Sequence, residues 1–140
     1  IPVLRYRTHD LTRVVTEKCS CGRTHARMQK VRARCDDMLI IRGTNVFPSQ
    51  VEDVLAGIEG VTPHYLIVVD NETGLDRMTV NVELKPEAFS DSFEVMDNFR
   101  QMVAEKLKGT LLVGVKVKLV EPGGIERSTG KTKHVKDLRK

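Results

Sequence analysis

The amino-acid sequence predicts an α+β fold, in which a small sheet is flanked by helices in a βαββαβ-like order. Two observations predict it. Two amphipathic stretches have the apolar spacing of helices, and four short segments have the alternating or continuous apolar pattern of strands. These six elements follow one another from Met38 onward, and both helices are expected on one face of the sheet. The 140 residues suffice for one domain or for part of a larger protein.

The first 35 residues carry weaker signals of structure. Residues 4–10 and 11–16 have an extended pattern, and residues 28–34 alternate between polar and apolar side chains. A loop rich in Cys, Ser, Gly and Thr covers residues 17–26. We therefore expect only short β segments before the main fold begins.

The first strand and the first helix of the main fold are expected next. Residues 38–41 are all apolar, as in a short buried strand. Ser49 and Glu52 have the spacing of a capping box, which predicts the start of a helix, and Gly60 predicts its end. This helix would bury one apolar stripe, formed by Val51, Val54, Leu55 and Ile58.

A hairpin, a second helix and a last strand complete the order. The apolar residues 65–69 and the alternating residues 78–84 are expected to pair across a turn at 70–77. A second capping box starts at Asp91, and Gly109 is expected to end the helix that follows. Its apolar stripe consists of Met96, Phe99, Val103 and Leu107.

The chain ends in an alternating strand and a polar segment. Residues 115–119 alternate between Val or Leu and Lys, which predicts the last strand. Residues 121–140 are polar and contain glycine. Without a larger domain on which to dock, this segment is expected to be mobile.

Charge is distributed unevenly along the chain. Lys and Arg outnumber Asp and Glu by nine to two in residues 1–35, and by eight to three in residues 115–140. In residues 36–114 they number six against fourteen. Two basic ends around an acidic middle predict an anionic ligand, either nucleic acid or a phosphorylated small molecule. Four Phe, two Tyr and no Trp argue against a surface that stacks bases.

The sequence also narrows the cellular setting. No apolar run approaches the ~20 residues of a membrane span, and the first residues lack the pattern of a signal peptide. The three cysteines make an odd count, which favours a reducing compartment over a disulfide framework. We therefore expect a cytoplasmic protein that does not bind a membrane.

Lys131 lies in the most unusual segment, a glycine-bearing loop at residues 121–131. Five residues separate Gly124 from Gly130, one more than a Walker phosphate loop allows, so we reject that motif. A lysine on a flexible arm can instead reach a phosphate or a carboxylate on which charge develops. A solvated basic tail is the alternative interpretation.

Three further clusters contain residue types that carry chemistry. Asp10 lies on one strand face with Tyr6 and Thr8, where it could accept hydrogen bonds from sugar hydroxyls or cap a turn. Asp36 and Asp37 lie between the basic arm that ends at Arg34 and the apolar strand. They would form only an incomplete metal site, because adjacent carboxylates in a strand point to opposite faces, and a charged turn is the alternative interpretation.

The third cluster is a cysteine loop. Cys19, Cys21 and His25 are zinc-ligand types at close spacing, and Cys35 could be a fourth ligand. Ligands from outside the chain, or no metal at all, remain alternatives.

Taken in order, three runs resemble the C-terminal part of the acyl-adenylate-forming enzymes. They are Tyr-Arg-Thr-His-Asp at residues 6–10, the run 34–52 with Asp-Asp-Met-Leu-Ile-Ile-Arg-Gly, and the run 121–131 that ends in Gly-Lys. The Asn-Val-Phe-Pro-Ser-Gln and Cys-x-Cys-Gly-Arg-Thr-His stretches are similar to the phenylacetate–CoA ligase branch. The resemblance covers nearly the whole chain.

The resemblance implies an ATP-dependent ligase with two half-reactions. A carboxylate attacks the α-phosphate of Mg-ATP to give an acyl-adenylate and pyrophosphate, and the thiol of CoA then displaces AMP. By motif, Lys131 matches the adenylation lysine, Asp10 the acid that binds the ribose, and Arg34 the arginine near ribose and phosphate. Asp36 matches the hinge about which the small domain reorients.

Arg42 and Gly43 match the loop that faces the thioester-forming site, where a residue without Cβ lets the backbone approach a pantetheine arm closely. By the same resemblance, Cys19 and Cys21 match cysteines that in some relatives join zinc ligands from the larger domain.

The resemblance also implies how the chain is organised. Residues 1–35 would be the closing β segment of a large N-terminal domain, and residues 36–140 the small mobile C-terminal domain. ATP, an aryl or arylacetic acid, CoA and that large domain would be the partners, and this part alone would be inactive. Two alternatives remain: a stand-alone ferredoxin-like module that binds a small ligand or regulates a partner, and a basic nucleic-acid-binding domain.

Overall fold

The computed structural model describes residues 4–71, 74–127 and 133–139. The chain divides into two compact units, which comprise residues 1–38 and 39–140. We call them the first unit and the second unit and describe each by itself. Within the second unit, two helices and a mixed four-stranded sheet confirm the small α+β fold predicted from the sequence.

The first unit consists of loops joined by two short antiparallel ladders. Strand β1 (Asp10–Leu11) pairs with β4 (Ala33–Arg34), and β2 (Val14–Val15) pairs with β3 (Arg27–Met28). The strands are short, as expected, and the extended patterns over residues 4–16 and 28–34 form only two residues of strand at a time. Their apolar side chains lie largely exposed, so no buried face extends the pairing.

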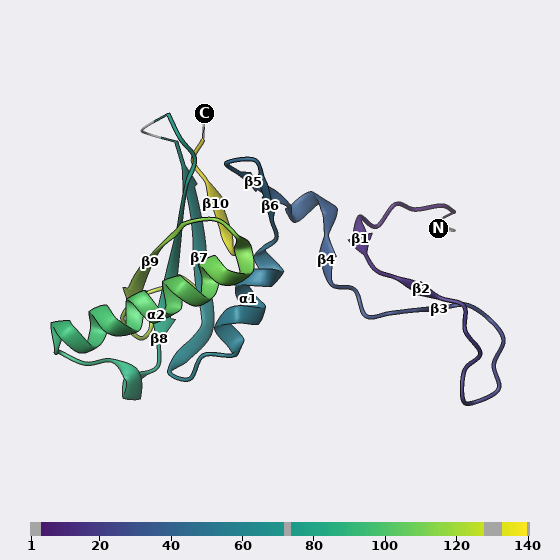
Figure 1. The fold of residues 1–140 in the computed structure, drawn as a ribbon, viewed down its shortest axis with the longest axis horizontal. Helices are drawn as coiled ribbons and strands as arrows, with labels where there is room; N and C mark the ends of the chain where they lie inside the picture. Colours follow the sequence, from purple (N-terminus) through teal and green to yellow (C-terminus); the bar gives the residue numbers. More distant parts are fainter. Residues whose placement is uncertain (1–3, 72–73, 128–132, 140) are drawn as a thin grey trace. The chain divides into compact units, whose positions relative to one another are not determined.

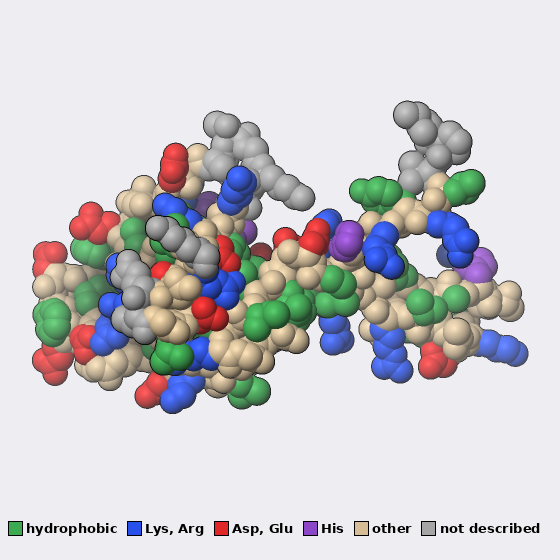
Figure 2. Space-filling view, turned by 90° about the horizontal axis from the view of Figure 1, so that it is seen from above, with side chains coloured by type: hydrophobic (Ala, Val, Ile, Leu, Met, Phe, Trp, Pro, Cys, Tyr) green, Lys and Arg blue, Asp and Glu red, His purple; other side chains and the backbone are tan. Residues whose placement is uncertain are grey.

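On one face of the first unit the basic side chains stand apart from one another. On the face drawn in Figure 2, Lys and Arg side chains of residues 4–38 are spread singly over the surface. A nucleic-acid backbone is usually met by a continuous basic stripe or patch. The face drawn offers no such stripe over these described residues.

The sheet of the second unit has the strand order β10-β7-β8-β9. The central strands β7 (Val61–Asp70) and β8 (Arg77–Leu84) form the expected antiparallel hairpin. The outer strands β9 (Val115–Val120) and β10 (Val135–Asp137) each run parallel to their neighbour. Figure 1 shows β10 (yellow) beside β7.

Both helices cover the same face of this sheet. Helix α1 (Pro48–Ala56) packs against β7, α2 (Phe93–Leu111) packs against β9, and the helices pack against each other. The alternation along β8 directs one side-chain set to these helices. The core between the layers contains the predicted stripe residues together with strand residues, among them Val51, Leu55, Ile67, Val80, Val82, Val103 and Leu107.

The N-cap of helix α1 lies two residues before Ser49, the N-cap that the sequence predicted. Phe47 is the N-cap, Pro48 is the first helical residue, and the Phe47 N–H donates to Oε1 of Gln50 at 2.9 Å. The expected Ser49–Glu52 box was therefore wrong, because proline fits the first helical position and Gln50 reaches back to the cap. The helix also ends at Ala56, before Gly60.

Helix α2 also differs from its predicted bounds. Its N-cap is Ser92 rather than Asp91. The helix continues through Gly109, and Leu112 ends it with a left-handed φ of 57° while its N–H donates to the Lys108 carbonyl. Glycine inside a helix costs only about 1 kcal/mol, which the packing of Leu107 and Leu111 in the core offsets. A short 3₁₀ turn, η2 (Pro86–Ala88), precedes this helix.

The predicted strand at 38–41 does not belong to the main sheet. It forms β5 (Leu39–Ile41), which pairs with β6 (Thr44–Val46) in a separate two-stranded hairpin. The edge position beside β7 belongs to β10 instead. The expectation that residues 38–41 join the main sheet was wrong, because β7 takes its outer partner from the far end of the chain.

The expectation of a mobile segment from residue 121 onward was also wrong for its described parts. The His134 carbonyl accepts from the Ile67 N–H, and the Leu138 N–H donates to the Val69 carbonyl, both at 2.8 Å. These bonds and the β10 ladder fix residues 134–138 against β7. Among the described residues, no helix has the length and apolar character that crossing a membrane requires.

Candidate functional site

Arg34 and Asp36 form a two-pronged ion pair in the first unit. Nε of Arg34 lies 3.0 Å from Oδ1 of Asp36, and Nη2 lies 2.7 Å from Oδ2. The hydrogen bonds from Arg34 lower the pKa of Asp36, and the same bonds raise the pKa of Arg34. Both side chains are about two-fifths exposed, so solvent screens the pair and it adds little stability. A planar guanidinium held this way is oriented rather than buried.

Asp10 lies directly opposite Arg34 in the ladder of β1 and β4. The Cys35 N–H donates to the His9 carbonyl at 2.7 Å, which continues the pairing one residue further. The charge of Asp10 also contributes to raising the pKa of Arg34. The structure thus brings together Asp10, Arg34 and Asp36, three residues that the sequence had singled out separately. Asp36 lies in η1 (Cys35–Asp37), just before the division at Met38.

Cys19 and Cys21 lie side by side in the loop of the first unit. Their sulfur atoms are 3.0 Å apart, and the hydrogen bond with Cys21 lowers the pKa of Cys19. A structural zinc ion requires four ligands. In the part of the chain that the structure describes, no group of three or more His, Cys, Asp or Glu side chains is placed to hold a metal ion. The pair therefore supplies at most half of a zinc site by itself.

Arg42 and Gly43 form the two-residue turn of the β5–β6 hairpin. Their φ angles are 50° and 79°, so both lie in the left-handed region that such tight hairpin turns require. A Cβ added to Gly43 would meet no described atom within 4 Å. Backbone conformation, rather than crowding by the described residues, therefore favours glycine here.

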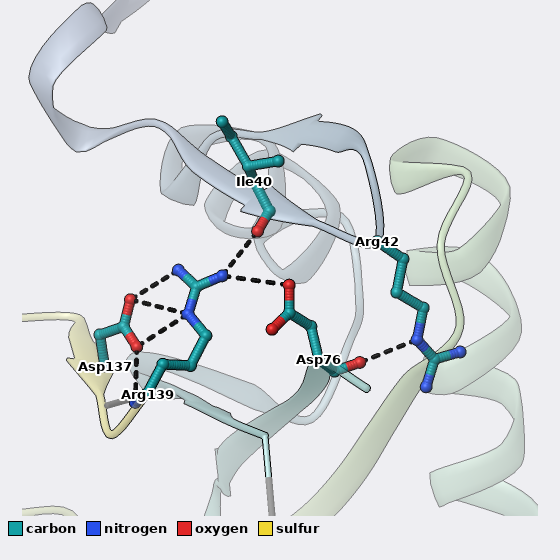
Figure 3. A network of polar contacts seen from close by, with 5 residues as sticks. All are labelled: Ile40, Arg42, Asp76, Asp137 and Arg139. Carbon is teal, nitrogen blue, oxygen red and sulfur yellow. Dashed lines mark hydrogen bonds and ion pairs between the residues drawn. The ribbon is translucent and has the colours of Figure 1, made fainter. Parts of the chain in front are cut away.

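A polar network joins this hairpin to the main sheet (Figure 3). Nε of Arg42 donates to the Asp76 carbonyl at 2.8 Å. Nη1 of Arg139 donates to the Ile40 carbonyl at 2.7 Å and contacts the Asp76 carboxylate at 3.2 Å. The rest of the guanidinium of Arg139 binds Asp137. Sequence reasoning missed this network, because neither the pattern around Asp76 nor that around Arg139 marks it.

Glu83 anchors the segment that precedes Lys131. Its side chain is only 2% exposed, on the face of β8 opposite the helices. Nη2 of Arg127 lies 2.7 Å from Oε1, and the Ile125 N–H lies 3.3 Å from Oε2. Burial alone would raise the pKa of Glu83, but the bonds from Arg127 and from the Gly123 and Ile125 N–H groups outweigh it and lower the pKa.

Lys131 itself lies outside the described residues. The chain is held on both sides of it. Arg127 binds Glu83 on one side, and on the other the His134 ring stacks on Tyr65 with ring centres 4.4 Å apart. The hydroxyl of Tyr65 in turn donates to the Pro48 carbonyl. In the alternating pattern of β8, Glu83 has the position of a solvent-facing residue. No local sequence pattern indicates that residues 123–127 bury it.

Comparison with known proteins shows the family of this chain. The family of AMP-binding enzyme C-terminal domains matches residues 43–139. The chain belongs to this family. Phenylacetate–coenzyme A ligase of Thermus thermophilus is 46% identical over a match that spans all of this chain and 34% of the relative. The chain spans about a third of the length of this relative and of two other curated relatives that it matches.

Two solved structures extend the comparison. A 2-hydroxyisobutyryl-CoA ligase in the postadenylation state has a TM-score of 0.80 and 30% identity, covering 93% of this chain and 28% of that one. A domain of a phenylacetate–coenzyme A ligase from Bacteroides vulgatus has a TM-score of 0.68 and 37% identity. It covers 75% of this chain and 95% of the solved chain.

Proposed function

We propose that this chain is the C-terminal part of an ATP-dependent ligase that joins an aryl or arylacetic acid to CoA. The observation that carries the proposal is 46% identity to a phenylacetate–coenzyme A ligase over the whole chain. In the first half-reaction the acid attacks the α-phosphate of ATP, which forms an acyl-adenylate and releases pyrophosphate. In the second, the CoA thiol attacks the acyl carbon and AMP leaves. This family match favours a ligase over a stand-alone module or a nucleic-acid-binding domain.

Nucleotide binding is assigned to Asp10 and Arg34. The carboxylate of Asp10 accepts hydrogen bonds from the ribose hydroxyls, and the guanidinium of Arg34 lies near ribose and phosphate. The ladder of β1 and β4, which sets the two residues opposite each other, supports this assignment. Because Arg34 is held by Asp36, its planar fork is oriented before a phosphate arrives.

Reorientation between half-reactions is assigned to Asp36. Residues 1–35 then close the large domain, and residues 36–140 form the small mobile domain. The position of Asp36 just before the division of the chain into two units supports this hinge.

Lys131 and the hairpin turn serve different half-reactions in this proposal. The ammonium group of Lys131 bridges carboxylate and phosphate oxygens while negative charge concentrates there. Arg42 and Gly43 face the pantetheine arm of CoA during thioester formation. That no described atom lies within 4 Å of a Cβ added to Gly43 supports that assignment.

In this proposal, metal ions bind together with ATP or with ligands from elsewhere in the ligase. Mg²⁺ accompanies ATP, where it neutralises phosphate charge. No described cluster of three carboxylates fits it here. The described cysteines fill only part of a zinc site, so any structural zinc needs ligands from elsewhere in the ligase. The cytoplasm is the compartment that we propose, since free thiols persist there.

The decisive experiment separates the half-reactions in the full-length ligase. Lys131→Ala should lower acyl-adenylate formation by about a hundredfold or more, because a charge that stabilises the transition state is lost. Thioester formation from supplied acyl-adenylate should stay within about threefold. Lys133→Ala, two residues away and exposed, is the matched control and should change neither rate. Equal loss of both half-reactions in Lys131→Ala would contradict its assigned role.

A further inference from the structure

The β5–β6 hairpin has few hydrogen bonds of its own to hold it in place. Its strands have three residues each, and it belongs to no larger sheet. A two-stranded hairpin of this size is marginal in water without support. Leu39, Ile41 and Val46 bury one of its faces in the core. The position of its tip therefore depends on whatever holds its other side.

Arg139 contacts the other side of the hairpin, and its own backbone is fixed to the main sheet. The Leu138 N–H donates to the Val69 carbonyl, so the backbone is fixed one residue before Arg139. Asp137 orients the guanidinium, with Nη2 2.6 Å from Oδ2 and Nε 3.0 Å from Oδ1. These contacts leave Nη1 directed at the hairpin, as Figure 3 shows.

The Ile40 carbonyl is well suited to accept this bond. Ile41 and Thr44 flank the two-residue turn and are the pair that exchanges ladder hydrogen bonds. Because hydrogen-bonded and non-hydrogen-bonded pairs alternate, the next pair, Ile40 and Asn45, directs its carbonyls away from the ladder. Nη1 of Arg139 meets the Ile40 carbonyl on that outer side at 2.7 Å.

Asp76 provides the second point of attachment. It lies immediately before β8, whose first residue Arg77 is paired with Asp70. Its carbonyl accepts from Arg42 in the turn, and its carboxylate contacts Arg139. The hairpin is thus bound to the main sheet at two places. Arg139, after β10, binds the Ile40 carbonyl. Asp76, before β8, binds Arg42 in the turn.

We propose that Arg139 is a positioning residue for thioester formation, which holds the turn at Arg42 and Gly43 in place through the Ile40 carbonyl and Asp76. The inference rests on the proposed function, since that function assigns the turn to the CoA half-reaction. Arginine is required because one planar group must serve Asp137, Asp76 and a carbonyl at once, and a lysine ammonium has no such fork.

The test measures both half-reactions of the full-length ligase. Arg139→Ala should lower the rate of CoA transfer from supplied acyl-adenylate by about ten- to a hundredfold, or raise the KM for CoA to a similar degree, because a displaced turn misaligns the reactants. The rate of acyl-adenylate formation should change by no more than roughly twofold. Arg139→Lys should show the same selectivity with a smaller loss.

Matched variants separate positioning from simple destabilisation. Arg100→Ala removes another arginine that binds an aspartate, in its partly exposed pair with Asp97 on α2, and should alter neither half-reaction. Asp76→Asn keeps the Arg139 side chain but weakens its ionic contact with residue 76, and should reproduce the selective loss in milder form. If Arg139→Ala is insoluble, Arg139→Lys and Asp76→Asn decide the question.

The outcomes are distinct. A selective loss of thioester formation supports the inference, and equal loss of both half-reactions, or no loss, overturns it. If the unaltered ligase forms no acyl-adenylate from any aryl or arylacetic acid, the proposed function fails first. In that case the inference about Arg139 falls with it.

Discussion

The ion pair between Glu83 and Arg127 should be strongly asymmetric when either partner is removed. Arg127→Met keeps the length and apolar character of the side chain but leaves the Glu83 carboxylate, which is 2% exposed, without its cationic partner. Glu83→Gln removes the buried charge and leaves Arg127, which is 47% exposed, free to be hydrated. We expect Arg127→Met to lower the free energy of unfolding of the second unit more than Glu83→Gln does.

The magnitudes follow from burial. Breaking a buried ion pair costs about 3–5 kcal/mol, but the exposure of Arg127 brings solvent screening, so Arg127→Met should cost about 2–3 kcal/mol. The loss of a charge-assisted hydrogen bond costs about 1.5–3 kcal/mol. Glu83→Gln recovers part of that through the lower desolvation of a neutral amide, which leaves a net cost of about 1–2 kcal/mol.

Urea unfolding followed by far-ultraviolet circular dichroism measures these costs. Both described helices lie in residues 39–140, so the helical signal reports the second unit. Arg100→Met is the control and should leave the unfolding midpoint unchanged, because its pair with Asp97 is partly exposed. If Glu83→Gln proved as costly as Arg127→Met, or costlier, the buried carboxylate would not be the group that needs its partner.

The same pair predicts a pH dependence with a definite sign. The folded pKa of Glu83 lies below its ordinary value of 4.5. Its stabilisation is therefore complete above about pH 4.5 and is lost as the pH falls through the folded pKa. Glu83→Gln should make the decline of unfolding free energy below about pH 4.5 shallower, while Asp36, Asp97 and Asp137 still contribute to it.

Two further changes test the backbone. Gly60→Ala should cost about 2–4 kcal/mol in urea unfolding, because Gly60 has a φ of 87° and the new Cβ would lie 2.7 Å from that of Ala88. Gly74→Ala has a similar φ of 79°, but its Cβ would meet no described atom within 4 Å, so a loss of only about 1 kcal/mol is expected, and equal losses would refute the role of crowding. Asp36→Pro should slow at least one half-reaction of the full-length ligase far more than Asp36→Ala does, because proline fixes φ and restricts Cys35. Indistinguishable rates in the two variants would argue against the hinge.

Sequence patterns identified the elements whose signal is local. The stripes of α1 and α2 and the alternation of β8 each follow from side chains within one segment, and the structure contains all three. The bounds were less certain, because Gln50 and Leu112 fix helix ends through particular hydrogen bonds that periodicity does not encode.

Strands and burial set by distant partners could not be read in the same way. The three residues of β10 include Lys136 and Asp137, and only their register against β7 makes them a strand. Glu83 has the polar phase of an exposed residue, yet residues 123–127 return to cover it. Of the site, the structure joins Asp10, Arg34 and Asp36, whereas Lys131 lies outside the described residues.

The bond between Ile40 and Arg139 spans ninety-nine residues of sequence. At ribosomal rates of about 5–20 residues per second, roughly 5–20 s pass between the synthesis of these two residues. During that time the hairpin has its tight turn but lacks its outer hold, and the half-exposed Ile40 side chain stands at an unpaired strand edge. During synthesis this strand edge is therefore open to wrong pairing until Arg139 has been made and can bind the Ile40 carbonyl.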